Sequence, residues 1–372
     1  MISKSVLFRQ HHFLELLKTF DLEKGPIDVF VSLYFRHHPQ LGSKDRLFIV
    51  ERIYKYFRWK LLIEALVKEG TSLFDLLEQE FPAQKDLPPH VRVSFPENLF
   101  QVLQKSFSDE TEQVCLACNE KAPITIRVNP IKTTRAFVQE RLRAYEIESE
   151  EIEEAPLALK LNRRVNLAQL QEFKEGLFEM QDAGSQKVAS LLEVKAGDQV
   201  LDYCAGSGGK TLAFAHRMNG KGQIFLYDVR KSALDEAKKR LCRAGVQNMQ
   251  IIYPEEKEKL SRLKGKMDWV LLDVPCTGTG TLRRNPDLKW KFSEATLSSL
   301  LQEQRAIFTE GVFYLKPGGS LIYATCSILR DENEDQLSWF LENFPVEMVN
   351  PPFSSLPSKD MDGFFSVRLR RK

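Results

Sequence analysis

The chain has 372 residues, of which 43% are hydrophobic, and its formal net charge is +2. This length predicts two or three domains, and the apolar content is sufficient for sizeable cores. The near-neutral balance excludes a uniformly basic protein, although positive clusters at 283–284 and 368–372 suit a local contact with a polyanion. No run of about 18 apolar residues occurs, so we expect no membrane span.

The N-terminus and the cysteines bear on the compartment. The first residues, MISKSVLFRQHH, lack the apolar core of a secretory signal. Two of the six scattered cysteines follow predicted buried strands, where a disulfide framework is unusual. We therefore expect a cytoplasmic protein. Cys115 and Cys118 form a single CxxC pair, and because a structural zinc site takes four ligands we expect no metal site.

Residues 1–92 predict an all-α domain. Helical spacing of apolar residues is found in 11–20, in 27–35, in a longer helix capped by Ser43 and in 72–81. Between Arg52 and Lys60 aromatic and basic residues alternate. Such interleaving suits RNA binding, but we favour a buried stripe with a basic outer face. Residues 82–96 are rich in proline and charge and predict a linker.

Residues 93–176 predict a small α+β domain. Its pattern gives helices near 97–107 and 108–119, with Ser108 as the N-cap of the second. A short strand follows at 124–128, then a helix at 134–144 and further alternation at 145–148.

From residue 177 onwards strands and helices alternate. The pattern predicts strands at 199–203, 223–228, 248–253, 268–272, 320–325 and 363–369, and helices at 231–244, 294–314 and 331–343. This alternation is typical of an α/β domain with a doubly wound, mostly parallel sheet. The last two strands are close in sequence, a spacing compatible with an antiparallel pair.

A glycine-rich loop follows the first of these strands, in QVLDYCAGSGGKT (199–211). Strand, glycine loop and helix N-terminus together predict a site for a nucleotide-like ligand. The later stretches WVLLDVPC (269–276) and LIYATCS (321–327) are strands that end in Cys276 and Cys326. Because parallel strands share a carboxyl edge, we expect the loop and both thiols to meet there.

Two nucleotide ligands compete at this loop. A phosphate-binding loop requires a glycine where the chain has Cys204, although 270–273 would pass for the Mg²⁺-binding strand of an ATPase. Asp228, at the tip of the second strand, suits a ribose diol, which a triphosphate site does not need. Asp202 and Asp228 together therefore favour S-adenosylmethionine, with a helix N-cap as the alternative role of Asp228.

The two thiols favour covalent chemistry. A buried cysteine is usually a small hydrophobe, but two at neighbouring strand tips, one preceded by Asp273 and a proline, favour reactive groups. Attack requires a thiolate, which the cofactor sulfonium and Lys210 would both stabilise.

The chain resembles the Sun/Fmu (RsmB-type) RNA cytosine-C5 methyltransferases, relatives of the nucleolar Nop/NSUN enzymes. The N-terminal stretch 41–58 is similar to the NusB-like RNA-binding domain of the bacterial ribosomal RNA enzyme. The resemblance implies a NusB-like helical domain (1–92), a small N1 domain (93–176) and a Rossmann-like methyltransferase domain (177–372). It covers most of the chain through IRVNP (126–130), QDAGSQ (181–186), LDYCAGSGGKT (201–211), LLDVPCTGTGTLRRNPDLKW (271–290), YATCSILRDENE (323–334) and DGFFSVRLRRK (362–372).

By this resemblance Cys326 is the nucleophile that attacks C6 of a flipped cytosine, so that C5 can accept a methyl group. Asp273 contacts N3 and the exocyclic amine and also neighbours the cofactor. Cys276 assists loss of the C5 proton and release of the adduct. Lys210 holds the loop and the cytosine region.

The resemblance also assigns binding residues. Asp228 contacts the ribose, while Arg283 and Arg284 meet RNA phosphates, the alternative for this pair being an exposed loop salt bridge. The methionine part of the cofactor is cradled by Cys204, Ala205, Gly206, Ser207, Gly208, Gly209 and Lys210.

Two positions depart from the family pattern. Gly206-Ser207 stands where the family usually has Ala-Pro, and because the residues remain small we expect cofactor binding to survive. By its spacing to Asp273, Pro254 replaces an aspartate near the adenine. Glu255 is the candidate substitute, the alternative being apolar and backbone contacts, and we expect a weakened but retained affinity.

The resulting prediction is a monomeric methyltransferase that forms 5-methylcytosine in 16S ribosomal RNA. Transfer RNA is the alternative substrate. A non-catalytic, RNA-binding assembly factor would agree with the altered third strand but not with the two cysteines, and an ATPase is opposed by Cys204.

Overall fold

The computed structural model describes residues 4–22, 25–81 and 86–372. Residues 82–85 of the predicted linker lie outside this range. The chain forms two compact units: unit 1 consists of residues 1–121 and 281–296, and unit 2 of residues 122–280 and 297–372. None of the described helices is long and apolar enough to cross a membrane.

Unit 1 is entirely helical in its described residues. Its core is built where one face of each helix is apolar, as at Ile49, Ile53 and Phe57, which are at most 4% exposed. Its helices are α1 (Lys4–Thr19), α2 (Ile27–His37), α3 (Ser43–Lys68), α4 (Leu73–Glu78), α5 (Pro89–Arg92), α6 (Glu97–Phe107), α7 (Thr111–Asn119) and α14 (Leu288–Lys291).

The aromatic and basic stretch between 52 and 60 lies on α3. Arg52 donates to the carbonyl of Phe48, and Lys55 donates to the carbonyl of Leu77. The aromatic side chains of this stretch belong to the core cluster of the unit. These contacts agree with the structural interpretation, a buried stripe whose cations bind the unit's own backbone.

The predicted linker is part of the packed unit beyond residue 85. It contains helix α5, and the residues after this helix, Val93 and Phe95, are 1% and 0% exposed. The proline-rich composition was therefore misleading, because prolines here begin α5 and α6 instead of keeping the chain extended.

Two predicted caps are also wrong. Helix α3 begins at Ser43 and its N-cap is Gly42, whose N–H donates to the Asp45 carboxylate at 3.1 Å. Ser108 ends α6 with φ +48° and makes no side-chain cap.

The segment 281–296 returns to unit 1 from the middle of the α/β sequence. Lys289 on α14 is 1% exposed and donates to the carbonyls of Arg58 (2.6 Å) and Ser94 (2.7 Å) and to Oδ1 of Asn119 (2.9 Å). All three ammonium protons thus have acceptors. Burial lowers the pKa of Lys289 well below its usual value.

Unit 2 begins with a small antiparallel sheet in the order β2-β3-β1-β4. Strand β1 lies in its centre, paired with β3 and β4. The sequence predicted only its central strand. Its elements are β1 (Ile124–Val128), α8 (Arg135–Arg143), β2 (Ser149–Glu151), β3 (Ala158–Leu161), α9 (Gln171–Lys174) and β4 (Phe178–Met180).

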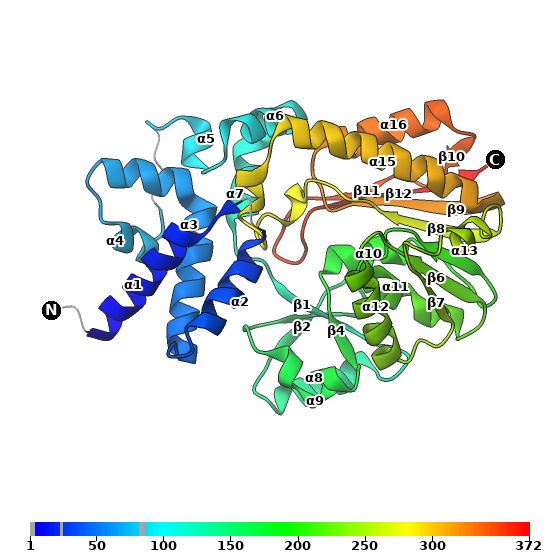
Figure 1. Cartoon of the computed structure of the whole chain (residues 1–372), viewed down its shortest axis with the longest axis horizontal. Coiled ribbons are helices and arrows are strands. Elements are labelled where there is room, and N and C mark those ends of the chain that lie inside the picture. Colours follow the sequence, from blue (N-terminus) through cyan, green and yellow to red (C-terminus); the bar gives the residue numbers. More distant parts are fainter. Residues whose placement is uncertain (1–3, 23–24, 82–85) are drawn as a thin grey trace. The chain divides into compact units, whose positions relative to one another are not determined.

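The rest of unit 2 is a doubly wound sheet in the order β10-β12-β9-β8-β5-β6-β7 (Figure 1). Five strands, β9, β8, β5, β6 and β7, run parallel to one another. Strand β12 is antiparallel to β9, β10 and β11. The strands are β5 (Gln199–Asp202), β6 (Gln223–Tyr227), β7 (Met249–Ile252), β8 (Met267–Asp273), β9 (Leu315–Thr325), β10 (Val346–Met348), β11 (Phe353–Ser355) and β12 (Phe364–Arg371).

Helices cover both faces of this sheet (Figure 1). The first face carries α10 (Ala183–Ser190), α11 (Gly209–Phe214) and α12 (Lys231–Ala244), and the second carries α13 (Lys257–Ser261), α15 (Glu294–Tyr314) and α16 (Glu334–Asn343). The chain leaves β5 towards β6 on one side, while β8 pairs with β5 on the other. The carboxyl end of β5 is therefore a topological switch point, where open α/β sheets bind ligands.

Candidate active site

The loop after β5 has the backbone of a ligand cradle. Gly206 and Gly208 have φ of +51° and +76°, which residues with a side chain rarely adopt. A Cβ at Gly208 would lie 3.2 Å from the Cβ of Ala237, so this position also needs a small residue for close packing. The next residue, Gly209, begins α11, and Gly208 is the N-cap of that helix.

Asp228, directly after β6, is 5% exposed and holds this loop. Its Oδ2 accepts from the N–H of Gly206 at 2.8 Å, and its Oδ1 accepts from the N–H of Arg230 at 2.8 Å. Burial alone would raise the pKa of Asp228, but the hydrogen bonds from Arg230 and Gly206 outweigh it and keep the pKa below the usual value. The N-cap of α12 is Arg230, so Asp228 lies two residues before the cap.

The Arg230 guanidinium also contacts this carboxylate, at 3.1 and 3.2 Å, and its side chain is 67% exposed. An exposed arginine can move aside, which would free acceptor positions for the two hydroxyls of a ribose. Val229, between the two, is 74% exposed and gives an apolar surface beside the carboxylate. The carboxylate acceptors of Asp228 and the glycine backbone of the loop fit a ribose-containing cofactor.

A second contact fixes the loop from α12. Nη1 of Arg240 donates to both the carbonyl (2.8 Å) and Oγ (2.7 Å) of Ser207. The same guanidinium pairs at 3.1 Å with Glu179 on β4, which is 3% exposed. Arg240 thus ties the middle of the loop to the small sheet. No sequence pattern indicates this role, since Arg240 stands in a helix rich in charge.

Lys210, which is buried, and Asp273, which is partly exposed, form an ion pair at the sheet edge, with Nζ and Oδ2 2.5 Å apart. Lys210 is 8% exposed, and its Nζ lies 5.6 Å from the centre of the Phe364 ring. Burial favours the neutral amine, but Asp273 outweighs it and raises the pKa of Lys210. Both predicted residues therefore lie at one point, and the lysine keeps its charge there.

Cys276 and Cys326 lie side by side after β8 and β9. Their Sγ atoms are 3.3 Å apart, which permits a hydrogen bond between a thiol and a thiolate. The contact with Cys326 and burial both raise the pKa of Cys276 well above its usual value. Cys276 is therefore held as a thiol, the poorer nucleophile of the two forms.

A buried carboxylate holds the loop that carries Cys276. Glu332 is 0% exposed and accepts from the N–H (2.9 Å) and Oγ1 (2.5 Å) of Thr277 and from Nε2 of Gln304 (3.0 Å). Burial raises the pKa of Glu332 despite these donors. Glu332 lies in the motif YATCSILRDENE (323–334), but no role was predicted for it from the sequence.

Two glycines bring the cysteine loops into backbone contact. The N–H of Gly280 donates to the carbonyl of Cys326, and the N–H of Gly363 donates to the carbonyl of Gly280, both at 2.9 Å. A Cβ at Gly280 would lie 2.1 Å from the Gly363 oxygen. Only glycine fits at position 280, where the backbones approach so closely. This contact holds the backbone of Cys326 at a fixed distance from the loop after Cys276.

The remaining predicted residues differ in their exposure. Arg283 is 1% exposed and belongs with Arg284 to the segment of unit 1. The burial of Arg283 contradicts the alternative of an exposed loop salt bridge at this residue. It also leaves the side chain almost no surface for a phosphate. The third-strand candidate, Glu255, is exposed and pairs with Lys231 at 2.9 Å. Cys204, within the glycine loop, has a pKa raised well above the usual value by burial.

The sequence matches known proteins along most of its length. Residues 189–369 match the model of the 16S rRNA methyltransferase RsmB/F family, and 95–168 match its ferredoxin-like domain. Ribosomal RNA small subunit methyltransferase B of Vibrio vulnificus is 34% identical over 84% of this chain and 74% of its own length. The chain belongs to the RsmB/F methyltransferase family.

Two further similarities agree with this membership. A probable ribosomal RNA small subunit methyltransferase B of Synechocystis is 32% identical over 75% of this chain and 67% of its own length. The crystal structure of a methyltransferase homologue from Pyrococcus horikoshii superposes with a TM-score of 0.67 and 26% identity, covering 76% of this chain and 98% of that one.

Membership in the RsmB/F family confirms the predicted resemblance and the Rossmann-like fold class. The family depends on S-adenosylmethionine, as predicted. The ferredoxin-like match covers the small sheet from β1 to β3, together with α6 and α7, which pack in unit 1. The ATPase alternative has no support from these relatives.

Proposed function

We propose that this RsmB/F family member is an RNA methyltransferase that forms 5-methylcytosine, with small-subunit ribosomal RNA as its substrate. The observation that carries the proposal is the thiol pair, 3.3 Å apart, on the same sheet edge as the Lys210–Asp273 ion pair. The relatives in Vibrio and Synechocystis are named for the same substrate class. An RNA substrate also agrees with the cytoplasmic location expected from the sequence.

The loop geometry supports the cofactor residues that the resemblance implies. The turn 204–209 would hold the methionine part, Asp228 would accept from the ribose hydroxyls after Arg230 moves aside, and Val229 would pack on the adenine. An apolar contact between Val229 and the adenine would replace the contact of the family's aspartate, whose position Pro254 occupies in this chain. When bound, S-adenosylmethionine supplies an electrophilic methyl group on a positively charged sulfur.

The chemistry begins at Cys326. Its thiolate adds to C6 of a cytosine, forming a sulfur–carbon bond and moving an electron pair to C5, which is otherwise a poor nucleophile. Asp273 contacts N3 and the exocyclic amine, and Lys210 fixes Asp273 in place. Bound S-adenosylmethionine would supply the methyl group that C5 accepts, with the bond between the methyl carbon and the cofactor sulfur breaking as the bond to C5 forms.

Cys276 acts in the last step. C5 loses its proton and the bond between sulfur and C6 breaks, which restores the aromatic ring and returns Cys326 as a thiolate. Cys276 carries the proton of the pair and lies against the attacking sulfur, so it can donate a hydrogen bond to that sulfur as it leaves C6, while the proton lost from C5 passes to solvent water.

The direct test is transfer of label. The full chain is incubated with radiolabelled S-adenosylmethionine and small-subunit ribosomal RNA from a strain that lacks the protein, with transfer RNA in parallel. Label in 5-methylcytosine of the ribosomal RNA supports the proposal. Label in transfer RNA alone would replace the substrate, and cofactor binding without label in either RNA or in isolated subunits would favour a non-catalytic assembly factor.

A further inference from the structure

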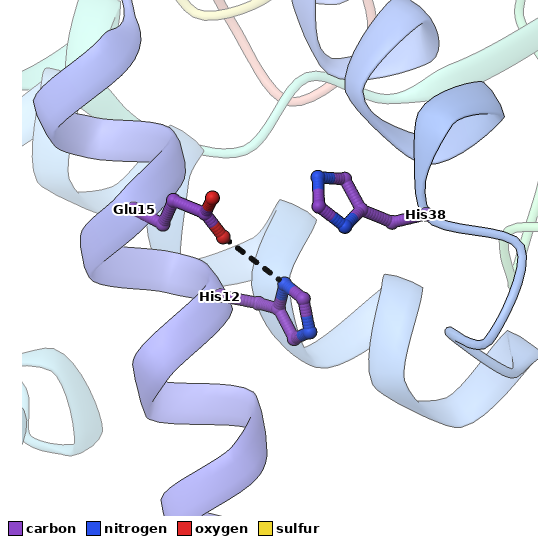
Figure 2. A group of neighbouring side chains, drawn as sticks. All are labelled: His12, Glu15 and His38. Atoms are coloured by element: carbon purple, nitrogen blue, oxygen red, sulfur yellow. Dashed lines mark ion pairs between the residues drawn. The ribbon is translucent and has the colours of Figure 1, made fainter.

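Four of the six histidines occur as two pairs, 11–12 and 37–38. The fold of unit 1 brings one member of each pair together with a glutamate: His12 and Glu15 on α1, and His38 directly after α2 (Figure 2). One ligand atom from each of the three lies within 4.8 Å of the others. His12 and Glu15 are three residues apart and share a helix face.

The three side chains converge from two elements. Nδ1 of His12 lies 3.5 Å from Oε2 of Glu15, marked in Figure 2, and the His12 and His38 rings are 5.1 Å apart. His12 is 4% exposed, whereas Glu15 and His38 are partly exposed. A small ion from solvent can therefore reach the cluster, and a buried imidazole forms its base.

Tyr34 marks the point at which these ligands converge. Its hydroxyl donates to Oε2 of Glu15 at 2.6 Å and lies 2.7 Å from Nδ1 of His12, while its ring stacks on His38 at 4.2 Å. Oε2 of Glu15 and Nδ1 of His12 thus face the same hydroxyl, and because its one proton goes to Glu15, Nδ1 donates its own proton to the Tyr34 oxygen. A bound ion would displace this network and select the His12 tautomer whose ligating nitrogen is unprotonated.

We propose that His12, Glu15 and His38 bind a divalent transition-metal ion, for which Zn²⁺ is the probe. Imidazole and carboxylate ligands suit Zn²⁺, Ni²⁺ and Cu²⁺, whereas Mg²⁺ and Ca²⁺ prefer all-oxygen sets. The fourth position is open to water or to His11, whose Nε2 lies 4.0 Å from Glu15. The ion would join the middle of α1 to the end of α2, a structural role in the helical unit.

Calorimetry on the full chain, first stripped of metal by a chelator, should show one Zn²⁺ per chain. X-ray absorption at the zinc edge should then show nitrogen and oxygen neighbours. The coordinating element matters because the chain has six free cysteines, including the pair at the candidate active site. Sulfur neighbours, or no binding, would overturn the proposal.

Variants locate the site. Glu15→Gln keeps an oxygen to accept from Tyr34 but loses the carboxylate charge, and His38→Ala removes a partly exposed ring. Each should lower Zn²⁺ affinity at least about tenfold. His37→Ala is the matched control, since His37 is exposed and contacts the Leu33 carbonyl. Equal affinity in His38→Ala and His37→Ala would contradict the assignment.

Tyr34→Phe separates the metal site from a hydrogen-bond network. The variant frees both ligand atoms, so Zn²⁺ should bind as tightly as before or more tightly. Zn²⁺ should also raise the melting temperature of the wild-type chain but not that of His38→Ala. Loss of binding in Tyr34→Phe would show that the phenol oxygen holds the ion and would overturn the three-ligand set.

Discussion

The Sγ atoms of Cys276 and Cys326 lie 3.3 Å apart at the ends of two neighbouring parallel strands, β8 and β9. This contact divides the roles of the two thiols, because the proton stays on Cys276. We expect Cys326→Ala to abolish methyl transfer while the cofactor still binds. Turnover near that of the wild type, measured by transfer of label to RNA, would assign the attack to Cys276.

Cys276→Ala should leave attack intact and block release. We therefore expect a covalent protein–RNA adduct that survives a denaturing gel and that Cys326→Ala does not form. The double variant is the control for adducts at other cysteines. Normal release of RNA by Cys276→Ala would remove the proposed role of this thiol.

Asp228→Ala should weaken S-adenosylmethionine binding by about 10- to 100-fold, because a hydrogen bond to a charged group contributes about 1.5–3 kcal/mol. Isothermal titration calorimetry measures this directly. Arg230→Ala is the matched control, since it keeps the carboxylate and its bond to Gly206. This control should bind equally or more tightly, as the competing guanidinium is gone. An unchanged affinity in Asp228→Ala would limit the residue to a structural role.

Arg240→Ala should weaken cofactor binding several-fold, because Ser207 loses both hydrogen bonds from Nη1 of Arg240 and is flanked by two conformationally free glycines. Ser207→Ala loses only the bond to Oγ and should have a smaller effect. Lys239→Ala, on the same helix but 76% exposed, should bind normally. Equal affinities in Arg240→Ala and Lys239→Ala would remove the positioning role.

Asp202 gives the protein a pH-dependent stability. It is 1% exposed, and burial raises its pKa to about 7 although Thr211 donates to it. Because the folded pKa lies above that of the unfolded chain, folding takes up a proton between these values. The contribution of Asp202 to the free energy of unfolding is most favourable below about pH 4, where the carboxyl group is protonated in both the folded and the unfolded chain. This contribution is lost as the pH rises to 7, where the free-energy cost of keeping the buried group reaches the order of a few kcal/mol.

Asp202→Asn should remove this slope. Urea unfolding between pH 4 and 8 would show a flatter pH profile of the unfolding free energy in the variant than in the wild type. The comparison concerns the slope, since other titrating groups are common to both chains. Parallel profiles would contradict a raised pKa at Asp202.

The sequence carried the local features of the site but not all of its neighbours. Helices 231–244 and 294–314 were predicted with the observed bounds, since their apolar spacing is long and regular. The glycine loop was equally readable. Arg240 was not, because its contacts with Ser207 and Glu179 depend on how α12 packs.

Segment 281–296 shows the same limit at larger scale. The resemblance assigned Arg283 and Arg284 in this segment to RNA phosphates, yet Arg283 and Lys289 are each 1% exposed. A buried lysine is stable only where oxygen atoms surround it, and the three that bind Lys289 are contributed by distant parts of the chain. Local sequence patterns hold no information about such pairing.

The place of Lys289 also sets an order of assembly. Its acceptors on Arg58, Ser94 and Asn119 are synthesised early, whereas the ammonium arrives only after residues 122–280. On the ribosome, the first 121 residues can collapse, but the oxygens of Arg58, Ser94 and Asn119 receive their hydrogen bonds only once Lys289 has been synthesised. The helical unit is therefore completed late in translation, and a release of the chain before residue 289 would leave it unfinished.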